Sequence, residues 1–275
     1  MNLDFSEDEL QRYSRHILLG EVGAIGQARL RAARVLIIGA GGLGSPLLLY
    51  LAAAGVGRIG LIDDDRVELS NLQRQIAHAT ERLGMNKTRS AAIAARALNP
   101  QVAVIEHDHR LTAENVLGLV ADYDIVCDGS DNFATRFLVA DASVLARRTL
   151  VSAAVLRFEG QLAVFRPDGP CYRCLYPEPP PPDLVASCSE AGVLGAVTGV
   201  MGTLQATEVL KEITGIGETL AGRLLLWDAL AARFRTITLR RDPDCALCGA
   251  QPTIIAPGTA PDTAPGAAAE TVCAG

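Results

Sequence analysis

Residues 35–74 read VLIIGAGGLGSPLLLYLAAAGVGRIGLIDDDRVELSNLQR. The stretch opens with a short apolar, mostly β-branched run at 35–38, and GAGGLG at 39–44 follows it as G-x-G-x-x-G. A strand that leads through a tight glycine turn into a helix brings backbone N–H groups against a phosphate. The stretch therefore predicts a phosphate-binding βαβ unit.

The next expected strand, 58–62, ends in the consecutive aspartates Asp63, Asp64 and Asp65. A carboxylate at this point can bind ribose hydroxyls, so the pattern to here is compatible with NAD. The sequence then departs from a typical dehydrogenase, because SNLQR at 70–74 adds amides and a guanidinium just beyond the carboxylates. A site that binds a polyphosphate while a nucleophile attacks it needs such donors. The combination predicts chemistry at the phosphates of a nucleotide.

Bulk composition limits the remaining classes of function. The chain has 275 residues, 49% of them hydrophobic, enough for one good core or a large domain with an appendage. A net charge of −6 without a basic run argues against a general nucleic-acid-binding surface. The N-terminus is acidic, unlike a signal peptide, and the apolar stretches 47–56 and 193–204 are too short or too glycine-rich to span a bilayer. We expect a cytoplasmic protein with reduced thiols.

Strand-like segments alternate with helical ones over most of the chain. Expected helices cover 5–32, 87–98, 113–121, 133–147 and 193–212, and expected strands cover 35–38, 58–62, 102–106, 124–127 and 150–154. Short connections in this order indicate an open, largely parallel sheet with helices on both faces. The segments 161–166, 223–227 and 233–239 alternate apolar and polar residues, as antiparallel strands do.

Four of the seven cysteines form two C-x-x-C pairs, Cys171 with Cys174 and Cys245 with Cys248. Two such pairs can supply four thiolates to one tetrahedral ion, so they predict a closed and therefore structural zinc site. Such a site would clip the segment near Gly249 onto the loop near the first pair. The predicted fold class is α/β, a Rossmann-like, largely parallel sheet with an antiparallel extension and a four-cysteine zinc clip.

The expected organisation has four parts. They are an N-terminal helical segment (1–32), a nucleotide-binding Rossmann-like region (33–166), a region of the same domain with a loop, a helix, antiparallel strands and the zinc clip (167–250), and a disordered tail (251–275).

Other cysteines, histidines and aromatic residues carry weaker signals. We interpret Cys127 as a buried strand residue and place Cys273 in the tail. His107 and His109 flank an aspartate in a polar segment, which favours a surface role over a site. Trp227 is interpreted as a core residue, and no stacking platform for bases is evident.

Several motifs occur together and in order. They are Arg12-Tyr13-Ser14-Arg15, Gly39 to Gly44, Asp63 to Asp65, Ser70-Asn71-Leu72-Gln73-Arg74-Gln75, Lys87, Asp131-Asn132 and the two cysteine pairs. With these motifs the chain resembles the ThiF/MoeB/HesA family of ubiquitin-activating-enzyme-like adenylyltransferases. The resemblance implies that Mg·ATP is used to adenylate the C-terminal Gly-Gly carboxylate of a small ubiquitin-fold sulfur carrier protein, with release of pyrophosphate.

The resemblance also implies roles for individual residues. Arg74 and Lys87 would bind the phosphates, Asp131 would be the Mg²⁺ ligand, and Asp63 would hold the ribose. The matching arginine of the family reaches into the partner subunit's ATP site, so Arg15 implies a homodimer. The nucleotide-binding residues carried over by the match are Gly39, Gly41, Gly42, Gly44, Asp63, Asp65, Ser70, Asn71, Leu72, Gln73, Arg74, Lys87, Asp131 and Asn132. Taken alone, the two basic residues could form a solvated face, and Asp131 could cap a helix.

Cys188 lies between a proline-rich loop and an expected helix. A thiol at a helix N-terminus is favoured as thiolate and is a candidate nucleophile. In some relatives a cysteine at the matching place forms a covalent link to the activated carrier, whereas others release the acyl-adenylate without one. Both interpretations stay open.

Two rival functions remain. An NAD-dependent oxidoreductase would share the glycine turn and Asp63 but leave 70–74, Lys87 and the zinc clip unexplained. A non-catalytic scaffold would be expected to lose the charged site residues, which are all present.

The pathway is a further open choice. We favour a molybdopterin-type carrier from the loop sequence 176–195, with a thiamine-type carrier as the alternative. Because no rhodanese-like domain follows the second cysteine pair, we expect a separate persulfide sulfur donor.

Overall fold

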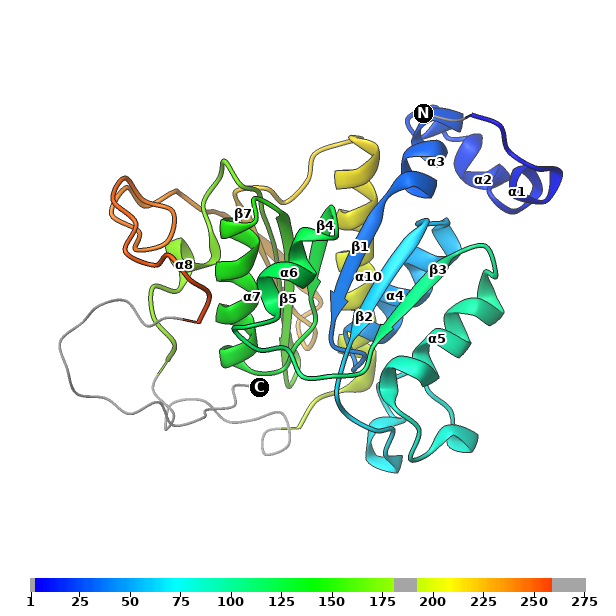
Figure 1. Ribbon diagram of the computed structural model, residues 1–275, viewed down its shortest axis with the longest axis horizontal. Helices are drawn as coiled ribbons and strands as arrows, with labels where there is room; N and C mark the ends of the chain where they lie inside the picture. Colours follow the sequence, from blue (N-terminus) through cyan, green and yellow to red (C-terminus); the bar gives the residue numbers. More distant parts are fainter. Residues whose placement is uncertain (1–2, 181–191, 259–275) are drawn as a thin grey trace.

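The computed structural model of the protein describes residues 3–180 and 192–258. Within these ranges one eight-stranded sheet runs in the order β3-β2-β1-β4-β5-β6-β7-β8 (Figure 1). The strands are β1 (Arg34–Ile38), β2 (Arg58–Ile62), β3 (Ala103–His107), β4 (Ile125–Asp128), β5 (Thr149–Leu156), β6 (Glu159–Phe165), β7 (Arg223–Asp228) and β8 (Arg233–Thr238). Five strands are parallel and the last three are added antiparallel, so the predicted fold class is confirmed for the sheet.

Helices cover both faces of the sheet (Figure 1). They are α1 (Glu7–Arg12), α2 (Ser14–Ile17), α3 (Gly23–Ala32), α4 (Gly44–Ala54), α5 (Lys87–Leu98), α6 (Val116–Ala121), α7 (Phe133–Leu145), α8 (Tyr172–Leu175) and α10 (Gly195–Thr214), with short 3-10 helices η1 (Leu69–Asn71) and η2 (Thr80–Arg82). Helices α4, α5 and α10 pack on one face, and α6 and α7 pack on the other.

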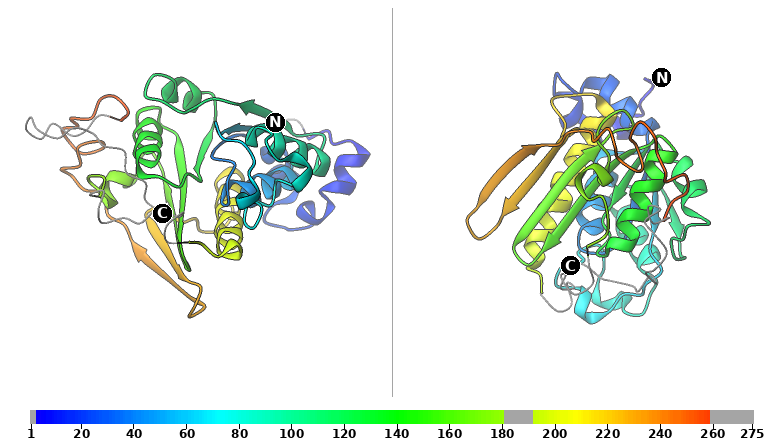
Figure 2. Two further views of the ribbon diagram at one scale, coloured as in Figure 1. Left: turned by 90° about the horizontal axis from the view of Figure 1, so that it is seen from below. Right: turned by 90° about the vertical axis from the view of Figure 1, so that its left-hand side faces the viewer.

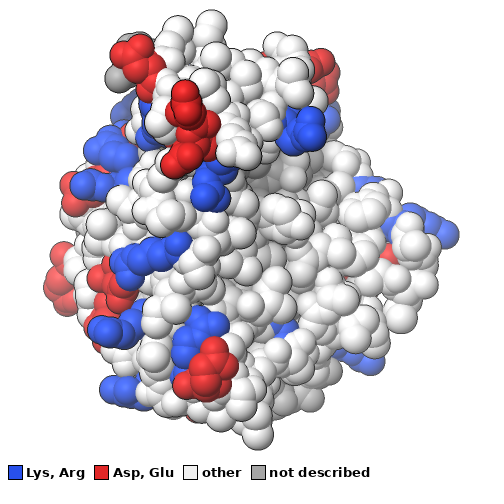
Figure 3. Space-filling view, turned by 90° about the vertical axis from the view of Figure 1, so that its right-hand side faces the viewer, with Lys and Arg blue, Asp and Glu red and all other residues white. Residues whose placement is uncertain are grey.

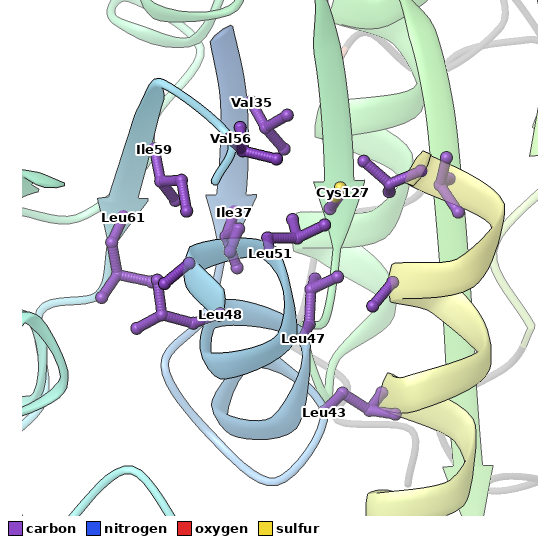
Figure 4. Close-up of a cluster of buried hydrophobic side chains, with 14 of the residues drawn as sticks. Val35, Ile37, Leu43, Leu47, Leu48, Leu51, Val56, Ile59, Leu61 and Cys127 are labelled. Carbon is purple, nitrogen blue, oxygen red and sulfur yellow. The ribbon is translucent and has the colours of Figure 1, made fainter. Parts of the chain in front are cut away.

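Strand β1 shows how the sequence pattern builds these layers. Its side chains alternate between the two faces, as a strand requires. Val35 and Ile37 pack in the core cluster with helix α4 (Figure 4), whereas Leu36 and Ile38 pack on the other face in the cluster with α7. All four are at most 3% exposed, because a parallel strand covered on both faces is apolar throughout.

The strand order reverses next to β1. From β1 the chain proceeds outward through β2 to β3, and then returns to place β4 on the other side of β1. The connections that leave the carboxyl ends of β1 and β4 therefore diverge. Ligands of open α/β sheets bind in the crevice at such a reversal.

The antiparallel end of the sheet projects from the body of the molecule as a β7–β8 hairpin (Figure 2). Every residue of β8 is exposed. Trp227 of β7 stacks on Phe234 of β8 with ring centroids 5.4 Å apart and planes 6° apart. Trp227 is thus only partly buried at the edge of the core, rather than inside it.

The N-terminal segment differs from the expected helix over 5–32. Helix α1 starts at a capping box formed by Ser6 and Glu9, and the chain bends at Tyr13 before α2. Gly23 then takes a φ of +56°, in the left-handed region that favours glycine, and opens α3. The helical periodicity is therefore present but divided over three helices.

Residues 251–258 are ordered against the protein, although the whole of 251–275 is expected to be disordered. The N–H groups of Thr253 and Ile254 donate to the carbonyl of Ala246 at 2.8 and 2.9 Å. Ile254 is 1% exposed and packs on Cys245 and Leu247. One buried isoleucine outweighs the Ala/Pro/Thr-rich composition around it, so the ordered chain continues past 250.

Helix α5 has the predicted bounds, and Cys127 is fully buried as predicted. Among the described helices, none combines the length and apolarity needed to cross a membrane. On the face shown in Figure 3, basic and acidic side chains are interspersed, without a field of one sign.

Candidate nucleotide-binding site

A pocket of about 350 Å³ opens at the carboxyl ends of β1, β2 and β4, where the strand order reverses. It is lined by segments that follow four different parallel strands. Of the predicted nucleotide-binding residues, those that line it are Gly39, Gly41, Gly42, Asp63, Asp65, Arg74, Lys87, Asp131 and Asn132. Residues separated by up to 93 positions in sequence are thus brought to one cavity.

The glycine turn forms one wall of this pocket. Gly39 has a φ of +90°, which a residue with a side chain rarely adopts. A Cβ on Gly44 would collide with the carbonyl oxygen of Gly39, so Gly44 shapes the turn from beneath and does not line the pocket. Among the described residues we find no acceptor for the N–H groups of Gly41 and Gly42. These donors, next to the amino end of α4, favour an anion.

Asp63 holds the glycine turn in place. Its Oδ2 accepts a hydrogen bond from the Ala40 N–H at 2.8 Å, and its Oδ1 accepts one from the Asp65 N–H at 2.9 Å. Burial raises the pKa of the Asp63 carboxyl above its usual range, against the opposing effect of Lys87 and of these N–H groups. The carboxylate therefore has a local structural role, and its remaining acceptor capacity faces the pocket.

Lys87 and Arg74 supply the positive charge. Lys87, the first residue of α5, is 7% exposed, and its Nζ lies 2.7 Å from Oδ2 of Asp65. The Arg74 Nη1 donates to the carbonyl of Ser70 at 3.1 Å. Both cations line the pocket. Because Lys87 is also buried, the alternative that it lies on a solvated helix face does not apply to it.

The preceding motif residues shape the turn rather than the pocket wall. The amide oxygen of Asn71 accepts from the Glu68 N–H at 3.1 Å and holds η1. The Gln73 carbonyl lies against Gly195 at the start of α10. Ser70, Asn71, Leu72 and Gln73 are absent from the described pocket lining, which resumes at Arg74.

Asp131 and Asn132 lie between β4 and α7. The Asn132 Oδ1 accepts from the Thr135 N–H at 2.8 Å, so Asn132, and not Asp131, is the N-cap of α7. Asp131 is exposed to the pocket one residue earlier. Its carboxylate is available to a cation there, since oxygen ligands are those that Mg²⁺ prefers.

Arg136 supports this segment from below. It is 6% exposed, and its guanidinium donates to the carbonyls of Ser130 and Ala153 at 2.6 and 3.1 Å. Asp128, 1% exposed, accepts from the Ser130 N–H and hydroxyl at 3.0 and 2.6 Å. The turn that carries Asp131 is therefore fixed by buried charged groups.

Some lining residues were not singled out by sequence reasoning. Gln75 is 4% exposed, and its Oε1 has no hydrogen-bond partner among the described residues. It directly follows Arg74 in the quoted motif, which is the signal that could have found it. His109 is exposed, as expected, but also lines the pocket with Arg110 and Leu111.

Arg15 is not brought to this pocket. It is exposed on α2, which packs on α3, and α3 leads into the amino end of β1. The pocket lies at the carboxyl end of that strand, so helix α2, which carries Arg15, is at the opposite end of the sheet in the same chain (Figure 1). Cys188 and Cys273 lie outside the described residues.

The four paired cysteines form one cluster. Their Sγ atoms lie 3.8 Å apart for Cys171 and Cys174, 3.6 Å for Cys171 and Cys245, and 3.5 Å for Cys174 and Cys248. A tetrahedral zinc with Zn–S bonds of about 2.3 Å requires S–S separations of about 3.8 Å. The cluster therefore fits a four-coordinate zinc.

The environment of these thiols explains why a bound cation would stabilise their thiolate form. Burial and the neighbouring thiols raise the pKa of Cys171, and burial raises the pKa of Cys248 to about 11. The backbone N–H of Asp242 points at the Cys174 sulfur at 3.4 Å. Thiolates crowded into this apolar cluster are compensated when a cation binds them together.

The sheet and the pocket at its carboxyl edge define the chain as a Rossmann-like α/β protein. It belongs to the ThiF family, whose model matches residues 13–247. It is 57% identical over 251 residues to the Bos taurus protein named adenylyltransferase and sulfurtransferase MOCS3, an alignment that covers 90% of this chain and 55% of that protein. The chain thus spans about half the length of this relative.

One further match supports the family and another supports the fold. The chain is 52% identical over 255 residues to the sulfur carrier protein adenylyltransferase of Thermus thermophilus. This alignment covers 90% of this chain and 94% of that protein. The crystal structure of E. coli MccB with ATP superimposes with a TM-score of 0.76 at 24% identity, covering 89% of this chain and 75% of that one. The match to the MccB structure supports the fold alone.

Proposed function

We propose that this protein is an ATP-dependent adenylyltransferase that activates the C-terminal Gly-Gly carboxylate of a small ubiquitin-fold sulfur carrier protein. The observation that carries the proposal is a single pocket lined by the glycine turn, Lys87, Arg74 and Asp131, in which the N–H groups of Gly41 and Gly42 have no acceptor among the described residues. The names of the bovine and Thermus relatives support the same activity.

The reaction joins two anions. An oxygen of the carrier's terminal carboxylate attacks the α-phosphorus of ATP, the bond between that phosphorus and the bridging oxygen to the β-phosphate breaks, and pyrophosphate leaves. The product is an acyl-adenylate. Arg74 and Lys87 would offset the negative charge as the groups approach, and the donors of Gly41 and Gly42 would hold phosphate oxygens.

Two metals belong to the proposal. Asp131 would hold Mg²⁺, which supplies further charge neutralisation at the phosphates. Cys171, Cys174, Cys245 and Cys248 would hold a structural zinc, since four thiolates leave no open coordination position for catalysis. Reduced thiols at that site are consistent with a cytoplasmic location.

The partners are also proposed. Arg15 cannot serve its own chain's pocket from the opposite end of the sheet, so we propose a homodimer in which it serves the partner's pocket. We favour a molybdopterin-type carrier, and a thiamine-type carrier with Cys188 as a covalent residue is the alternative. We also propose a separate persulfide donor as the source of the sulfur.

ATP–pyrophosphate exchange tests the proposal. Radiolabelled pyrophosphate should enter ATP only when a carrier ending in Gly-Gly is present. Lys87→Met should reduce exchange at least about tenfold, because it removes a buried cation from the pocket. Arg89→Met, on the exposed side of the same helix, is the matched control and should leave exchange unchanged.

The same preparation can separate the rival functions. Binding of ATP should raise the melting temperature, whereas NAD should not. A shift with NAD alone would favour an oxidoreductase, and a folded protein without exchange on any carrier would favour the scaffold.

A further inference from the structure

His78 is a buried histidine that no motif assigned to the site. It follows the segment 70–75 and is 7% exposed. Its Nε2 lies 3.0 Å from the carbonyl oxygen of Ala40 in the glycine turn. Its Nδ1 lies 2.9 Å from the hydroxyl of Ser90, which is fully buried in α5.

These contacts require one form of the imidazole. The carbonyl of Ala40 can only accept a hydrogen bond, so Nε2 must carry the proton and donate it. In the neutral ring, Nδ1 then accepts from the hydroxyl of Ser90. One tautomer therefore satisfies both nitrogens of His78, and the ring is fixed from both sides.

The surroundings of His78 favour this neutral ring. Lys87 and Arg82 are the charged groups that act on it, and both are cations. Burial together with these two charges lowers the pKa of His78 to about 4. The imidazole thus stays neutral at physiological pH.

The Ala40 residue is held at both of its polar groups. Its N–H donates to Asp63 at 2.8 Å, and its carbonyl accepts from His78 at 3.0 Å, with the Ser45 hydroxyl at 3.5 Å. Because a peptide group is planar and trans, the direction of the Ala40 carbonyl determines the direction of the Gly41 N–H that follows it. That N–H is one of the pocket donors without an acceptor among the described residues.

We propose that His78 is a positioning residue, which aims the Gly41 N–H at a phosphate of the nucleotide by donating a hydrogen bond to the Ala40 carbonyl. This inference rests on the proposed function in one respect, namely that ATP is the ligand. His78 does not line the pocket and acts only through the turn.

Two substitutions test the hydrogen bond. His78→Leu removes it, and the Kd of ATP in the presence of Mg²⁺, measured by calorimetry, should rise about tenfold or more. His78→Gln places an amide donor near the position of Nε2 and should bring the Kd back to within about threefold of the wild type. His107→Gln changes a histidine that bonds Tyr123 outside the pocket lining and should leave the Kd unchanged.

Steady-state exchange and NMR add readouts that a purely structural residue would not change. The KM for ATP should rise in His78→Leu by a larger factor than kcat falls. In the wild type, nitrogen chemical shifts of the His78 ring should report the neutral Nε2–H tautomer at pH 7, a result that does not depend on whether His78→Leu folds.

Each outcome is decisive. A folded His78→Leu variant with wild-type affinity for ATP, or an Nδ1–H tautomer in the wild type, would overturn the positioning role. A wild-type protein that binds no ATP at all would instead contradict the proposed function, while the tautomer would still report on the hydrogen bond to Ala40.

Discussion

The carboxylate of Asp141 and the guanidinium of Arg173 form a two-pronged ion pair, with Nε–Oδ1 and Nη2–Oδ2 distances of 2.7 and 2.9 Å. The two side chains are 0% and 3% exposed. Arg173 lies between Cys171 and Cys174, and Asp141 lies in α7, whose amino end follows Asp131. One helix thus connects the cysteine cluster to the edge of the pocket.

Arg173→Met should destabilise the protein strongly, because it leaves the Asp141 carboxylate buried without its partner. Breaking such a pair costs about 3–5 kcal/mol. Urea unfolding of the single variant should show this loss, and the double variant with Asp141→Leu should recover much of it. A single variant within about 1 kcal/mol of the wild type would mean that water or another donor compensates Asp141.

Removing zinc should loosen the end of the described chain. Elemental analysis is expected to find one zinc per chain, and Cys174→Ser should lose the metal and melt at a lower temperature. Leu247 and Ile254 should become exposed, since they are buried in the cysteine cluster. Cys127→Ala, at a buried cysteine away from the cluster, should keep its zinc. Full stability of a metal-free protein would argue against a structural site.

Asp131→Ala should abolish adenylation and leave the fold intact. The residue is exposed, and Asn132 provides the helix cap, so neither core packing nor capping is lost. Exchange activity and a urea unfolding curve measure the two effects. Asp168→Ala is the control, because it removes an exposed aspartate that pairs at the surface with Arg147. Normal turnover in Asp131→Ala would refute its assignment as a metal ligand.

Gln75→Leu should separate stability from binding. The buried Oε1 of Gln75 has no partner among the described residues, and such an acceptor costs about 1–3 kcal/mol. Its replacement by an apolar group of similar size should leave the free energy of unfolding equal or higher. The affinity for ATP should fall about tenfold if the amide contacts the ligand. Unchanged affinity would indicate that Gln75 only fills space.

The His78 side chain should give the stability a specific pH dependence. Its pKa is about 4 in the folded protein, below the value of about 6.5 expected when the chain is unfolded. Between these values the unfolded chain binds a proton that the folded one does not, so stability falls as the pH falls from about 6.5 to about 4. Urea unfolding at pH 7 and pH 5 should show a larger loss for the wild type than for His78→Gln. Equal losses would contradict the depressed pKa.

Local patterns predicted the fold well. Short, mainly apolar runs placed β1 and β2, and helix α5 was predicted at its observed bounds because an alanine-rich segment ends there at Asn99-Pro100. The two C-x-x-C pairs predicted the cysteine cluster, because the spacing within each pair lets its two thiolates bind the same metal ion. The start of α3 at Gly23 depends on a single positive φ, which periodicity does not encode.

The interior of the site could be predicted only in part. The motif placed Arg74, Lys87 and Asp131 at one pocket, but it did not distinguish Asn71, which holds a turn, from residues that line the cavity. The contact of His78 with Ala40 joins positions 38 residues apart. Contacts of that kind follow from tertiary packing and leave no local signal.

The most direct test of adenylyl transfer is the mass of the carrier itself. Purified protein, Mg·ATP and a carrier ending in Gly-Gly, quenched and examined by intact mass spectrometry, should yield carrier with one AMP attached at its terminal carboxylate, and a carrier lacking the last glycine should not react. Unmodified carrier from a zinc-loaded, ATP-binding sample, across molybdopterin-type and thiamine-type carriers, would contradict the account.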